Sequence, residues 1–116
     1  MKKLLLLLFS ILISFNSYSE IYYGEYNKNP SNYDDYVNGL QLGMSWYGVA
    51  IMDENPSAKR YCKSGVMELE LNNIHTIIDS QVERFINDRG LDQATIDDVP
   101  ISLILLMGLE FTFPCN

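Results

Sequence analysis

The sequence predicts an all-α fold, a compact small helical bundle that is cross-linked by one disulfide. Three observations favour this fold class. Apolar residues recur at helical spacing in three long segments, while strand-like alternation is confined to the short run 66–71. The chain has only two cysteines, which can form one internal bridge. A domain of this length buries a modest core, and several packed helices are the simplest way to build it.

The first 19 residues have the features of a signal peptide. Two lysines precede an apolar run that extends to Phe15, and two serines fit the small-residue rule for cleavage before Glu20. The run is shorter than the roughly 20 apolar residues of a membrane span. We therefore expect a signal peptide at 1–19 and a single helical domain at 20–116 in the periplasm, with no membrane attachment after cleavage. An uncleaved anchor is the alternative.

The expected mature chain is strongly acidic. Without the two lysines of the signal peptide it has six basic residues against 15 acidic ones, a net charge of −9. Nucleic acid and anionic lipid are therefore poor partners, and a basic protein is a good one. Solubility alone would also explain this charge.

The two cysteines predict a structural disulfide. Cys62 and Cys115 are the only pair available in an exported chain, and their bond would close a loop of 53 residues. In the chain-entropy model such a loop contributes roughly 4 kcal/mol of stability. A redox role is not favoured, because no CxxC spacing is present.

The first half of the domain predicts an irregular arm followed by one long helix. Residues 20–32 are rich in tyrosine and turn formers, so we expect rings packed on the domain with hydroxyls in water, or alternatively stacked on a ligand. Helical spacing then runs from Ser31, which precedes Asp34 as in a helix start, to about Asp53. Gly39 and Gly43 lie on one face, which favours either close approach of another helix or a bend.

The second half predicts two more helices. The first begins with Asn72 or Asn73 as its cap and ends at Gly90. Residues 88–98 form an acidic connection that we expect to project as a loop. The last helix starts at Pro100 and is apolar all round, which predicts a buried centre of the domain or a subunit interface.

The sequence contains no recognisable catalytic or metal-binding constellation. His75 is the only histidine, and its place on the polar side of the second helix predicts a solvated surface side chain. No His, Cys or carboxylate cluster has ligand spacing, and no glycine-rich phosphate loop follows a strand. We therefore expect no cofactor, no metal and no enzymatic activity.

Two stretches resemble a known family. "YCKSGVMELELNNIHTIIDSQVERFI", an acidic spacer and "DDVPISLILLMGLEFTFPC" together resemble the Rap/Tai family of type VI secretion immunity proteins. The likeness covers Cys62 to Cys115 and is most specific at the final "FPC". It departs at 63–65, where the family commonly has a proline. The resemblance implies an all-helical fold, the Cys62–Cys115 bond, frequent homodimerisation, and inhibition of a peptidoglycan amidase in the periplasm.

The acidic connection is the predicted toxin-binding surface, because a short loop can enter a catalytic cleft where a helix cannot. The expected contact residues are Asp88, Leu91, Asp92, Ile96 and Asp97. The alternative is that these aspartates only solvate the loop and cap the last helix. A small acid-responsive periplasmic chaperone is a second function with the same gross features; it would expose apolar surface in mild acid, whereas an inhibitor need not.

Overall fold

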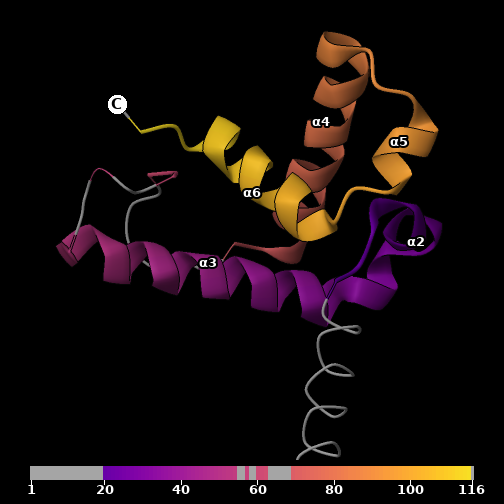
Figure 1. The fold of residues 1–116 in the computed structure, drawn as a ribbon. Helices are drawn as coiled ribbons and strands as arrows, with labels where there is room; N and C mark the ends of the chain where they lie inside the picture. The colour runs from indigo at the N-terminus through magenta and orange to yellow at the C-terminus, as the bar shows by residue number, and fades with distance from the viewer. Residues whose placement is uncertain (1–19, 55–56, 58–59, 63–68, 116) are drawn as a thin grey trace, which may run out of the picture.

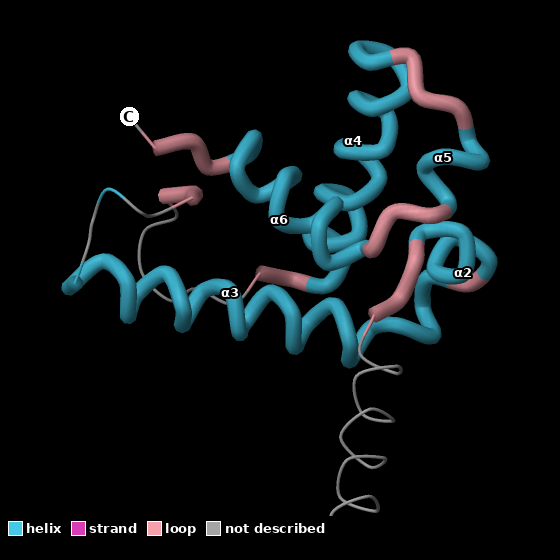
Figure 2. Tube along the Cα trace, viewed as in Figure 1, coloured by secondary structure: helices cyan, strands magenta, loops and turns pink. Residues whose placement is uncertain are grey.

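The structure is a computed structural model that describes residues 20–54, 57, 60–62 and 69–115 (Figure 1). The predicted signal peptide and the first half of the extended run 66–71 lie outside these residues. The all-α fold class is confirmed, and Figure 2 shows helix along most of the described trace and no strand in it. The helices are α2 (Tyr23–Lys28), the 3-10 helix η1 (Pro30–Tyr33), α3 (Asp34–Glu54), α4 (Leu71–Arg89), α5 (Gln93–Asp97) and α6 (Ile101–Thr112).

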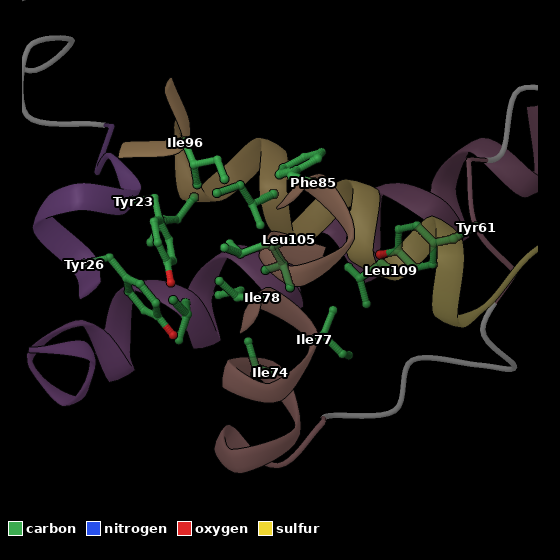
Figure 3. Packing of buried hydrophobic residues seen from close by; sticks show 14 residues of the cluster. Tyr23, Tyr26, Tyr61, Ile74, Ile77, Ile78, Phe85, Ile96, Leu105 and Leu109 are labelled. Atoms are coloured by element: carbon green, nitrogen blue, oxygen red, sulfur yellow. The ribbon is translucent and has the colours of Figure 1, made fainter. Parts of the chain in front are cut away.

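Helices α4 and α6 pack against each other and form the core (Figure 3). The apolar face of α4 is buried, except that Ile86 is 42% exposed. Burying a side chain of this size contributes about 1.5–3 kcal/mol, so this contact supplies most of the apolar stabilisation. The buried apolar residues of the pair are Ile74, Ile77, Ile78, Val82 and Phe85 from α4, and Ile101, Ile104, Leu105 and Leu109 from α6.

The two helices approach each other most closely at Gly108. A Cβ atom at this position would lie 2.6 Å from Ile77 Cγ2 and 3.1 Å from the Ile77 carbonyl oxygen. Because real Cβ atoms do not come so close to other heavy atoms, only glycine allows α6 to lie this near α4. The predicted central position of α6 is confirmed for the face that carries Gly108, whereas Leu103 on another side and Phe111 near the C-terminal end of the helix are exposed.

The N-terminal arm is a helix and not the irregular segment that the sequence predicted. Six residues of it form α2, and the extended residues before α2 bond to the start of α6. The Tyr23 N–H donates to the Val99 carbonyl (2.9 Å), and the Ile101 N–H donates to the Ile21 carbonyl (2.8 Å). Tyr26 is fully buried, so the expectation of a hydroxyl in water is wrong for this residue. The helix was missed because it is short and has no side-chain cap.

Helix α3 lies along one side of the core, as predicted for residues 31–53. It buries Val37, Gln41 and Ser45, which are spaced four residues apart and therefore share one face. The predicted close approach of another helix at the two glycines is not made within this chain. The position of a Cβ at Gly39 or Gly43 has nothing within 4 Å among the described residues, so no other described helix approaches them.

The Cys62–Cys115 disulfide is present, as predicted. It joins the segment after α3 to the residues after α6, and its two Cα atoms are 5.0 Å apart. Next to it, the Cys62 N–H donates to the Phe113 carbonyl at 2.7 Å, and Arg60 forms a 2.7 Å ion pair with Glu110. Tyr61 lies buried between these contacts (Figure 3). The bond therefore fixes the end of the chain on the domain.

We predict that the Cys62→Ser, Cys115→Ser double variant is less stable than the oxidised protein by about 2–5 kcal/mol, because the unfolded chain regains the entropy of an open 53-residue loop. Urea unfolding followed by far-UV circular dichroism measures the difference. Reductant should lower the stability of the wild type to that of the variant and leave the variant unchanged. Equal urea midpoints for oxidised wild type and variant would show that the bond is not stabilising.

Candidate functional site

The residues predicted to bind a toxin lie in one corner of the fold, where α4 ends and α5 follows (Figure 1). Gly90 has a left-handed backbone conformation (φ 64°), and the Leu91 N–H reaches back to the Phe85 carbonyl at 3.1 Å. This C-terminal motif ends α4 and turns the chain towards α5. Asp88 and Asp92 are exposed, and Leu91 and Asp97 are partly buried. We call these four residues the acidic corner.

The fifth predicted contact residue, Ile96, is part of the core and has no exposed surface. It is buried because the connection is not the projecting loop that the sequence predicted. Residues 93–97 form α5, which turns Ile96 inwards against the domain. Ile96 therefore holds α5 in place. Of the five predicted contact residues, a partner can reach only the four of the acidic corner.

Two residues of the acidic corner also have structural roles. Asp92 is the N-cap of α5, and its Oδ1 accepts from the Thr95 N–H at 2.9 Å. Hydrogen bonds from Thr95, first from its side chain and then from its backbone N–H, lower the pKa of the Asp92 carboxyl. Asp97 accepts from Gln93 (2.8 Å) and lies against Gly24 of α2, where a Cβ would be 2.9 Å from the Asp97 Cβ. Asp92 therefore caps α5, a helix that the sequence did not predict.

The acidic corner presents negative charge to a partner. Within the described residues, no group of three or more His, Cys, Asp or Glu side chains is placed to hold a metal ion. Among the same residues, no helix is long and apolar enough to cross a membrane. What the corner offers is electrostatic attraction for cationic side chains around one apolar side chain, that of Leu91.

His75 is not the solvated surface residue that the sequence predicted. Its side chain is 19% exposed and connects three helices. Nε2 lies 2.7 Å from Asp34 Oδ1 at the start of α3, and Nδ1 hydrogen bonds to the Tyr26 hydroxyl of α2. An ionised carboxylate can only accept, so Nε2 donates to it, and in the neutral imidazole Nδ1 accepts from the phenol.

This Tyr26–His75–Asp34 chain was missed because its members are 41 and 49 residues apart, and helical periodicity reports only on the local face. It contains no activated nucleophile. Burial is the main cause that raises the pKa of the Tyr26 phenol, which disfavours the phenolate. These three hydrogen-bonded side chains therefore form a structural link between α2, α3 and α4.

A second surface lies on α3, on a face that no other described helix covers. A groove of about 570 Å³ follows this face, and Asp35 is the only charged residue that lines it. Trp46 and Tyr47 nearby are 63% and 66% exposed. We call this the α3 groove; its other lining residues are Tyr36, Gly39, Leu40, Gly43, Met44 and Tyr47.

Comparisons of the chain with protein-family models, with curated proteins and with solved structures found no match.

We predict that Asp92→Ala lowers the unfolding temperature at pH 7, because α5 loses its cap, and that Asp92→Asn does not, because asparagine is an equally good cap. The hydrogen bonds from Thr95 hold the pKa of Asp92 in the folded state below its ordinary value of 3.8, so its stabilisation is present above pH 3.8 and is lost as the pH falls through the folded-state pKa.

The deficit of Asp92→Ala should therefore shrink between pH 7 and pH 3, which thermal unfolding at several pH values measures. A deficit that is constant over this range, or one of equal size in Asp92→Asn, would contradict the capping role.

Proposed function

We propose that this chain is a periplasmic immunity protein that binds and inhibits a peptidoglycan amidase delivered by type VI secretion. The observation that carries the proposal is the end of the chain. The last apolar helix runs into Phe113, Pro114 and Cys115, and Cys115 is bonded to Cys62 in the structure. This is the feature on which the resemblance to Rap/Tai immunity proteins depends most.

The surface properties of the domain support a binding protein. Three of the five aspartates that are exposed among the described residues, Asp88, Asp92 and Asp98, lie between the last turn of α4 and the start of α6, on a chain whose expected mature charge is −9. An acidic surface accelerates the encounter with a basic partner and favours it over acidic ones. The acidic corner is held by the α4 C-terminal motif and by the buried side chain of Ile96. Its shape is therefore largely formed before binding, which reduces the entropy cost of association.

We predict that co-expression of this protein protects cells against the amidase, when both are directed to the periplasm and lysis is followed by optical density. The sharpest interface variant is Asp88→Lys, because Asp88 is exposed, lies in the last turn of α4 and has no ion pair among the described residues. It should reduce protection by replacing an attractive charge with a repulsive one.

The matched control for this experiment is Glu83→Lys. Glu83 is exposed on the same helix and the replacement makes the same change in charge, but it lies outside the acidic corner. Circular dichroism shows whether both variants fold. Lysis that wild-type protein does not diminish would refute the pairing with the amidase. Equal protection by both variants would place the interface away from Asp88.

We also propose that the protein is a homodimer and that the α3 groove is its interface. The groove is apolar and has two glycines at which a second helix can approach, since a Cβ at either position meets no described atom within 4 Å. Its one charged lining residue, Asp35, lies at one end. An antiparallel two-fold pairing of α3 with α3 therefore separates the two Asp35 carboxylates, and the contact is self-complementary.

We predict that Gly43→Leu converts the dimer to a monomer at micromolar concentration, as measured by light scattering. The added side chain fills the groove, while the monomer has room for it. The control is Asn87→Leu, which adds a leucine at an exposed position of α4. A wild-type protein that is already monomeric would refute the dimer, and a dimeric Gly43→Leu variant would place its interface on another face.

A further inference from the structure

A second groove lies between the C-terminal halves of α4 and α6 and is built around Arg84. It has a volume of about 350 Å³. Gln81, Arg84 and Asp88 line it from α4, and Met107, Glu110 and Phe111 line it from α6. Phe85 and Arg89 complete the lining. We call it the Arg84 groove, and it differs from the acidic corner in that its two arginines balance its two carboxylates.

The Arg84 side chain is held in one orientation. Its Nε and Nη2 donate to Gln81 Oε1 at 3.0 and 2.7 Å, and Gln81 is itself buried, with 6% of its surface exposed. The guanidinium carbon lies 3.8 Å from the centroid of the Phe111 ring. A guanidinium that is stacked and hydrogen bonded in this way loses little further freedom when it binds a ligand.

Arg84 is not neutralised. No carboxylate of the described residues forms an ion pair with it, and three of its five N–H groups remain after the two bonds to Gln81. The other charges at the groove do not change this. Glu110 is paired with Arg60 at 2.7 Å, and Asp88 and Arg89 at the rim have opposite signs. The groove is therefore a place on an acidic protein where cations are not outnumbered.

We propose that the Arg84 groove binds a segment of a partner protein that presents an Asp or Glu side chain between apolar residues. The carboxylate would accept from the free N–H groups of Arg84, which suit the two oxygens of a carboxylate. The apolar neighbours would contact Met107 and the Phe111 ring, which is 64% exposed. Arginine, methionine and aromatic residues are the types enriched at the centres of protein interfaces.

This inference does not require the partner to be an amidase. Its probe is a capped peptide, acetyl-Leu-Glu-Leu-Ala-amide, titrated into ¹⁵N-labelled protein and observed by NMR. We expect saturable shifts of the Arg84, Met107 and Phe111 amides with a Kd near about 1 mM or tighter. The matched peptide with Gln in place of Glu should bind about tenfold more weakly, because it lacks the charge-assisted bond.

Two variants test whether Arg84 is responsible. Arg84→Gln should weaken binding of the Glu peptide to the level of the Gln peptide. Lys28→Gln, which removes the same charge from an exposed position of α2 that does not line the groove, should leave binding within about twofold of wild type, a difference well under one hydrogen bond to a charged group. Unchanged shifts elsewhere in the spectrum show that each variant folds.

Several results would overturn the proposal. They are equal binding of the Glu and Gln peptides to wild-type protein, an equal loss in the Arg84→Gln and Lys28→Gln variants, absence of saturable binding, and shifts that map to the α3 groove. The first comparison uses wild-type protein only, so it decides the question even if Arg84→Gln does not fold.

Discussion

The contact between α4 and α6 at Gly108 is the constraint on which the rest of the fold depends. Because residue 108 has no side chain, the backbone of α6 lies against Ile77 and the aliphatic rows of both helices interlock. The remaining elements are placed around this pair. The residues before α2 bond to the start of α6, α3 packs along the pair, and the disulfide secures the tail behind α6. The Tyr26–His75–Asp34 chain then links α2 and α3 to α4 with hydrogen bonds.

The sequence predicted the long helices and the disulfide, because both depend on local signals. Apolar periodicity and the glycine at position 90 gave the extent of α3 and α4, and the cysteine pairing had no alternative.

The features that the sequence did not predict depend on contacts between distant residues. The spacing of Gly39 and Gly43 favoured a close helix contact at these residues, whereas the close approach is at Gly108. Gly108 lies in a helix that is apolar all round, so the sequence does not show which of its faces is packed. The partners of His75 and the burial of Ile96 were unpredictable for the same reason. The predicted contact residues Asp88, Leu91, Asp92 and Asp97 are accessible in full or in part, but sequence periodicity does not report that two of them also support α5.

The three surfaces differ in chemistry and in place, which bears on how several partners could bind one small domain. In Figure 1 the α3 helix and the corner between α4 and α5 are on opposite sides of the core. A dimer that formed through α3 would therefore leave the acidic corner uncovered.

Asp88 lines the Arg84 groove and also belongs to the acidic corner. A single partner that spans both would need cationic groups for the corner and a carboxylate for Arg84, and such an alternation of charge discriminates better than one sign alone.

The disulfide also determines when the protein reaches its full stability. Thiol–disulfide exchange ties the strength of this fold to the redox poise of its surroundings. In a reducing cytoplasm both thiols stay free, and the helices rely on a core of modest size. If the N-terminal segment directs export, the chain passes through translocation in this weaker form, which is easier to keep unfolded. Oxidation on the far side then closes the domain. Maturation would follow transport, and a copy that never left the cytoplasm would be a ready substrate for proteolysis.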